Sequence, residues 1–158
     1  MKKPLIKIFH KTNICCPFKK QSKNRVLSLA SFALLLDTEV VTDKYGNEFV
    51  LLSGMHKEIS WEVLDKTEFE AIENHVHVLD NLSNAEVCEL KQIAPNLCKC
   101  IQNALHMKYP HKEFCVYATA SVHDSFILRF HQLWDNESPY YDSNISYADD
   151  LIVFSPQK

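Results

Sequence analysis

Two β-rich runs close together in the C-terminal half constrain the fold of this chain most. Phe114–Ala120 (FCVYATA) and Phe126–Leu133 (FILRFHQL) are rich in β-branched and aromatic residues and alternate in polarity, which is typical of strands. Only residues 121–125 separate them. The two runs therefore predict a β-hairpin.

A second hairpin is predicted nearer the N-terminus. Glu39–Thr42 and Glu48–Leu52 flank residues 43–47, in which Gly46 can adopt the positive φ of a tight turn. Four further segments have strand character: Pro4–His10, Ile59–Leu64, His75–Leu79 and Leu151–Phe154.

One long helix carries the clearest start signal in the sequence. Ser83 can act as N-cap, and Glu86, three residues later, completes a capping box. The apolar spacing continues to Met107, but Pro95 lacks the N–H that the helix needs. We therefore expect two helical pieces or one kinked helix, with a shorter helical turn at Thr67–Glu73.

These elements together predict a single α+β domain over residues 1–158, with a mainly antiparallel sheet and a few packed helices. A chain of 158 residues with 46% hydrophobic residues can bury one core. Its two glycines, Gly46 and Gly54, stand alone, so no glycine-rich loop for nucleotide phosphates is present.

The charge is distributed unevenly. Residues 1–25, expected to form a basic strand and loop, carry eight Lys or Arg and no acid, so the rest has nine basic against 20 acidic residues, a net charge of −11. An acidic body attracts cationic partners and repels nucleic acid. A regulatory module that uses the basic arm on nucleic acid is the less favoured alternative.

The apolar run Val26–Leu36 follows this basic segment and resembles the core of a signal peptide. It has 11 residues, too few to span a membrane, and Asp37–Glu39 occupies the place of a cleavage site. We expect a buried helix or strand there, with no membrane association.

The cysteines favour a cytoplasmic location. Their spacing is irregular, which predicts six reduced thiols rather than a disulfide framework. Cys98 and Cys100 are two residues apart on the predicted helix and would point in different directions, so they cannot share a zinc ion.

Two acidic clusters remain. The first, which we interpret as a solvated face, comprises Glu58, Glu62, Asp65, Glu68, Glu70 and Glu73. The second combines carboxylates with large aromatics and has no Lys or Arg, a composition typical of binding surfaces for basic partners. We predict that its partner-binding residues are Trp134, Asp135, Glu137, Tyr140, Tyr141, Asp142, Tyr147, Asp149 and Asp150. Alternatively, these aromatics simply pack the segment onto the sheet.

The residue pattern gives little support to catalysis. His75 and His77 share one face of a predicted strand but lack a third metal ligand. Arg129 and His131 could bind an anion or act as an acid/base pair, but an exposed sheet face explains both residues equally well. We therefore predict no catalytic residue, metal or cofactor. A small hydrolase-like enzyme with these four residues lining a pocket on the sheet is the alternative.

The segment Phe114–Asp142, chiefly its DSFILRFHQLW and PYYD stretches, resembles the C-terminal part of small bacterial immunity proteins. Those proteins neutralise polymorphic or contact-dependent growth inhibition toxins. The resemblance covers about a fifth of the chain. It implies a non-catalytic cytoplasmic inhibitor whose partner is a cognate toxin domain, often a cationic nuclease, and the acidic body agrees with such a partner.

Overall fold

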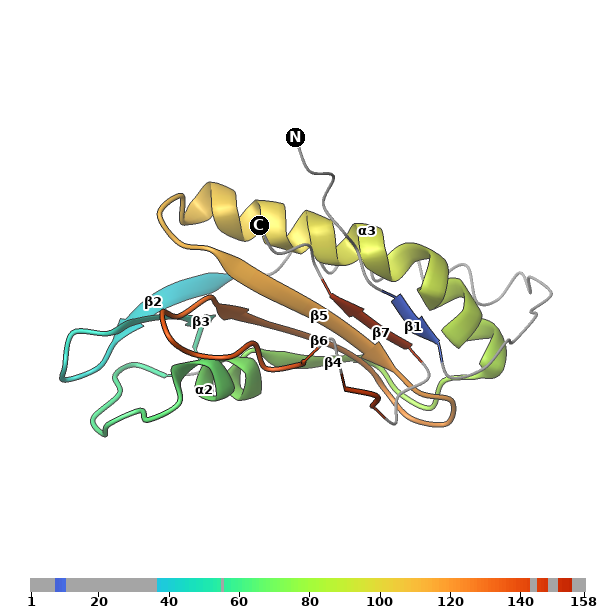
Figure 1. Cartoon of the computed structure of the whole chain (residues 1–158), viewed down its shortest axis with the longest axis horizontal. Coiled ribbons are helices and arrows are strands. Elements are labelled where there is room, and N and C mark those ends of the chain that lie inside the picture. The colour runs from blue at the N-terminus through green and yellow to red at the C-terminus, as the bar shows by residue number, and fades with distance from the viewer. Residues whose placement is uncertain (1–7, 11–36, 55, 143–144, 148–150, 155–158) are drawn as a thin grey trace.

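The computed structural model describes residues 8–10, 37–54, 56–142, 145–147 and 151–154 (Figure 1). The strands are β1 (Ile8–His10), β2 (Thr38–Thr42), β3 (Glu48–Leu52), β4 (His75–Leu79), β5 (Phe114–Ala120), β6 (Phe126–Gln132) and β7 (Leu151–Phe154). The helices are α2 (Lys66–Glu73) and α3 (Asn84–Lys108). The Val26–Leu36 run and the predicted basic loop lie outside the described residues.

The main sheet has the strand order β1-β7-β5-β6-β4, and its paired strands are antiparallel. The predicted hairpin of β5 and β6 is confirmed, with Phe114 opposite Gln132 and Ala120 opposite Phe126. Helix α3 runs along one face of this sheet (Figure 1). The α+β class is therefore confirmed.

Both faces of β5 are covered, and all seven of its residues are buried. Successive side chains of a strand point to opposite faces. Val116 and Ala118 belong to the core shared with α3, whereas Cys115 and Tyr117 form a separate cluster with tyrosines that follow β6. We call the sheet face that carries Tyr117 the outer face.

The predicted hairpin of β2 and β3 is also confirmed and forms a second, two-stranded sheet. Gly46 in its turn has a φ of 85°. Phe49 and Leu51 of β3 are fully buried in a smaller core beside α2, where Phe69 and Trp134 pack against them. The hairpin and α2 lie together at one end of the molecule (Figure 1).

Helix α3 begins with the predicted capping box. The Glu86 backbone N–H donates to the Ser83 hydroxyl (3.3 Å), and the Ser83 N–H donates to the Glu86 carboxylate (3.0 Å). The helix continues through Pro95 as one element that bends along its length (Figure 1), so of the two expected forms it is one continuous, bent helix. Leu90, Ala94 and Ile101 are all buried against the same sheet, which keeps both halves in one helix despite the missing hydrogen bond.

The segment Ile59–Leu64 is not a strand, which corrects the prediction. It makes one isolated bridge, between Ile59 and Asp43. Ile59 and Val63 are buried four residues apart, while Trp61 between them is 46% exposed. The segment alternates in polarity in the sequence, but in the described residues it has no neighbouring strand with which to pair.

The described cysteines comprise three free thiols, Cys98, Cys100 and Cys115, and one disulfide-bonded residue, Cys88. Cys98 is buried and Cys100 is exposed, as the helical spacing predicted. Because Cys88 is disulfide-bonded, the expectation of six reduced thiols is wrong, and with it the argument that cysteine spacing gave for a reducing compartment.

Candidate interaction surface

The predicted partner-binding segment starts directly after β6 and first packs on the smaller core. The Trp134 ring lies 5.3 Å from the Phe49 ring between centroids. Its indole N–H donates to the carboxylate of Glu70 over 3.1 Å. Trp134 is thus half-buried and joins the segment to α2.

Glu137 binds the N-terminus of α2 inside the molecule. Its carboxylate accepts the backbone N–H of Thr67 (2.7 Å) and that of Lys66 (3.3 Å), and it lies 3.4 Å from the Lys66 ammonium. Partial burial raises its pKa, but these hydrogen bonds outweigh that effect, so the pKa lies below its usual range. A carboxylate here satisfies N–H groups that a helix start leaves unpaired.

Replacing Glu137 with Ala should therefore lower the free energy of unfolding by about 1 kcal/mol, the usual effect of removing a helix cap. Asp135→Ala is the matched control, because Asp135 is exposed and should change stability by less than about 0.5 kcal/mol. Urea denaturation of both variants measures the difference. Equal stabilities would show that Glu137 is an ordinary surface acid.

The tyrosines of the segment lie against the outer face of the main sheet. Tyr141 contacts the fully buried Tyr117 (5.2 Å between centroids) and Tyr147 (4.9 Å), and Tyr140 lies 5.0 Å from Tyr141. Tyr140, Tyr141 and Tyr147 are all half-buried. This packing supports the alternative that they hold the segment on the sheet. Asp142 is exposed, and Asp149 and Asp150 lie outside the described residues.

The members of the first acidic cluster also have different environments in the structure. Asp65 is the N-cap of α2, and Glu73 pairs with His56 over 2.9 Å. Glu58, Glu62 and Glu68 are exposed, in agreement with a solvated face.

Glu70 is the exception, because it is fully buried at the centre of a polar network. One carboxylate oxygen accepts the Val50 N–H (2.8 Å), and the other accepts the Gln132 N–H (2.6 Å). The Gln132 side-chain amide donates to the same oxygen as the Val50 N–H (2.5 Å). One turn further along the same face of α2, Asn74 bonds the backbone of Val50 and Leu52. Glu70 and Asn74 thus make the hydrogen bonds to the free edge of β3 that a neighbouring strand would make.

Burial raises the pKa of Glu70 from 4.5 to about 7, although the hydrogen bonds from Gln132, Val50 and Trp134 oppose the shift. Sequence reasoning placed Glu70 on the solvated face and so missed this role. The available signal was its helical position, since Thr67, Glu70, Ala71 and Asn74 share one face of a helix.

The raised pKa predicts a stability that depends on pH. Glu70 binds its proton more tightly in the folded state, so this contribution is complete below about pH 4.5 and is lost as the pH rises through about 7. The shift corresponds to roughly 3 kcal/mol. The unfolding free energy of wild type minus that of Glu70→Gln, measured by urea denaturation, should fall by that amount as the pH rises across this range.

His131 provides an internal check on that pH measurement. Burial lowers its pKa, so it changes stability in the opposite sense, losing stability as the pH falls. This effect is common to wild type and Glu70→Gln and cancels in their difference. A difference that does not vary with pH would contradict the assignment to Glu70.

The two acidic clusters of the sequence meet at one end of the molecule. Glu137 and Trp134 join the second cluster to α2, and the Tyr45 hydroxyl in the β2–β3 turn lies 3.4 Å from the Glu62 carboxylate. We call the exposed residues here the acidic tip: Tyr45, Glu58, Trp61, Glu62, Leu64, Asp65, Glu68 and Asp135.

Three of the seven large hydrophobic side chains that are exposed in the described residues belong to the acidic tip. Tyr45 is 58%, Trp61 46% and Leu64 86% exposed. Tyr45 and Trp61 were absent from the predicted site, since the sequence placed Trp61 in a strand. Exposed aromatics among carboxylates can supply contact area and charge to a basic partner. Lys44 and Lys57 are the basic residues that dilute the charge here.

The histidines of the alternative enzyme site differ in burial. His75 and His77 are exposed, with ring centroids 5.5 Å apart. His131 is buried, with one ring nitrogen 2.8 Å from the Tyr117 hydroxyl and the other 2.6 Å from the Gln132 carbonyl. Within the described ranges, no group of three or more His, Cys, Asp or Glu residues is placed to hold a metal ion.

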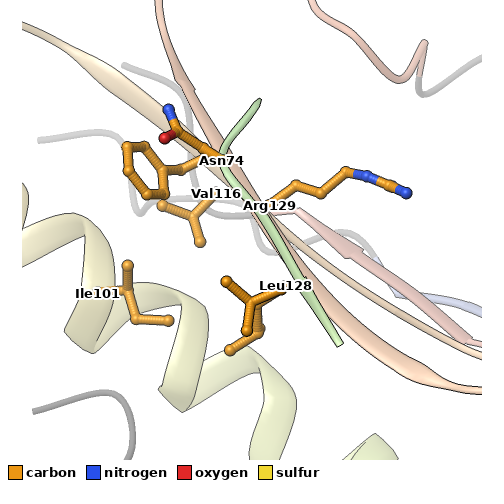
Figure 2. A pocket seen from close by; sticks show the side chains of 7 residues that line it. Asn74, Ile101, Val116, Leu128 and Arg129 are labelled. Atoms are coloured by element: carbon orange, nitrogen blue, oxygen red, sulfur yellow. The ribbon is translucent and has the colours of Figure 1, made fainter. Parts of the chain in front are cut away.

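A small cavity lies between α3 and the main sheet (Figure 2). Figure 2 shows Ile101, Val116 and Leu128 pointing toward one another, while the Arg129 side chain turns away to the other side of the sheet. The cavity volume is about 10 Å³. That volume is at the lower limit for one water molecule, so this is a packing gap rather than a ligand site.

Comparison with protein-family models, curated proteins and solved structures finds no match to this chain. In the part of the chain that the structure describes, no helix has the length and apolar character needed to cross a bilayer.

Proposed function

We propose that this chain is a non-catalytic binding protein that inhibits a basic protein partner by covering it with the acidic tip. The observation that carries the proposal is the exposure of Tyr45, Trp61 and Leu64 among the carboxylates of both acidic clusters. Isolated exposed apolar residues are common on proteins, but a group of them on a charged surface favours an interface.

The charge of the molecule supports the same kind of partner. The residues whose side chains are described include eighteen acids and eight Lys or Arg, a net charge of −10. Such a field accelerates encounter with a cationic protein. The resemblance to immunity proteins makes that partner a toxin domain of nuclease type.

An immunity protein acts in the cytoplasm, where thiols are kept reduced. The Cys88 disulfide of the structure does not agree with that compartment. The acidic tip contains no cysteine, so binding should not depend on that bond.

Coexpression tests the proposal. The gene directly upstream should encode a protein with a basic toxin domain, and this chain should protect cells that express the domain and should copurify with it. Loss of protection without this chain is the control for toxicity. A basic, toxic upstream product that neither binds this chain nor is neutralised by it would refute the proposal, as would the absence of such a gene.

A further inference from the structure

One cation on the outer face has no acidic partner. Arg129 lies in β6 with its guanidinium over the Tyr140 ring, 5.7 Å from the centroid. Among the described residues, no carboxylate lies within ion-pair distance of it, and its buried Nε makes no hydrogen bond. Lys66, Lys108 and Lys112 each lie within 3.4 Å of a carboxylate, whereas the charge of half-buried Arg129 faces a ring in this part of the chain.

The neighbours of Arg129 leave its charge uncompensated. Its direct cross-strand partners are Tyr117 on β5 and His75 on β4. The Tyr117 hydroxyl is already bonded to His131, and burial lowers the pKa of His131, which disfavours its charged form. The His75 ring is held by a hydrogen bond to the Ile72 carbonyl over 2.5 Å. Aromatic and imidazole groups therefore surround the guanidinium.

We infer that Arg129 is the centre of a site for a small oxyanion group, a carboxylate or a phosphate. The side chain is half-buried, and its terminal nitrogens are not among the buried atoms without partners. A guanidinium presents a planar fork of N–H groups that matches two oxygens of such an anion. The Tyr140 ring lies 5.7 Å from the guanidinium, and exposed His75 is the cross-strand neighbour of Arg129 on β4.

This site is separate from the acidic tip and does not depend on the proposed function. The Arg129 site binds an anionic group, whereas the acidic tip binds a cationic one. The group can come from a free anion or from a carboxylate carried by a peptide, and the two sources share the same chemistry at Arg129.

Nuclear magnetic resonance of the Arg129 side-chain N–H tests the inference in the intact chain. The buried Nε–H signal, assigned by its loss in Arg129→Lys, should shift saturably with sodium phosphate or sodium acetate at constant ionic strength set by chloride. A peptide with a free C-terminal carboxylate, compared with its amide, distinguishes a peptide-borne source from a free anion. No saturable shift with any of these anions would overturn the inference.

Thermal unfolding gives a second readout for variants. Added phosphate or acetate should raise the melting temperature of wild type and of Lys99→Gln, which removes one exposed charge from α3. Arg129→Gln should lose the effect, with affinity at least about tenfold weaker because two charge-assisted hydrogen bonds are removed. The same anion response in all three proteins would also overturn the inference.

Discussion

Replacing Glu70 with Ala should lower the free energy of unfolding by about 2 to 6 kcal/mol. The change leaves the backbone N–H groups of Val50 and Gln132 buried without an acceptor, and each such group costs about 1 to 3 kcal/mol. The side-chain N–H donors of Gln132 and Trp134 lose the same acceptor. We expect a much lower midpoint in urea denaturation near pH 6.

Glu68→Ala is the matched control, since Glu68 is an exposed acid of the same helix. It should cost no more than about 0.5 kcal/mol. If Glu70→Ala were as stable as Glu68→Ala, the polar network would not hold the hairpin, α2 and the end of β6 together. The rigidity of the acidic tip would then need another source.

Replacing Trp61 with Ala should weaken binding of the basic partner by about 2 to 4 kcal/mol, the range of an interface hot spot. Trp61 is half-exposed, so its loss should affect folding much less than binding, although its ring contacts Phe69 at 6.3 Å. Met107→Ala is the control, because Met107 is 84% exposed at the end of α3, outside the tip. Titration calorimetry with the partner measures both variants.

An unchanged affinity for Trp61→Ala would remove Trp61 from the interface. The circular dichroism and melting temperature of each variant show whether a loss of affinity comes from unfolding instead.

Local features of the fold could be predicted from the sequence. The two hairpins follow from alternation beside short connections, and the start of α3 follows from Ser83 and Glu86. At Pro95 the sequence left two helical pieces or one kinked helix open, because the outcome depends on whether the helix on both sides is buried against one sheet. Ile59–Leu64 was misjudged because alternation cannot reveal whether a strand partner exists.

The candidate surface could be predicted only in part. The acidic residues were recognised, but their roles depend on contacts between distant segments. Glu137 is 70 residues from Thr67, and Glu70 is 62 residues from Gln132. The helical spacing of Glu70 is a local signal of its burial, but no local pattern distinguishes Glu137 from exposed Glu58 and Glu62. The exposure of Trp61 likewise depends on how its loop packs.

Charge reversal at the acidic tip tests the central claim most directly. Glu58→Lys with Glu62→Lys is compared with Asp124→Lys with Asp142→Lys, which changes the net charge equally at exposed sites outside the tip. Glu68 is left unchanged because its carboxylate favours the N-terminus of α2.

The measurement is the affinity of each double variant for the basic partner, at low and at physiological salt. The tip variant should bind at least about tenfold more weakly than the control variant, with the difference falling as salt screens the charges. Both should unfold at the wild-type temperature. A tip variant that is stable and binds as tightly as wild type, while the control variant loses affinity, would contradict the claim and place the interface beside Asp142.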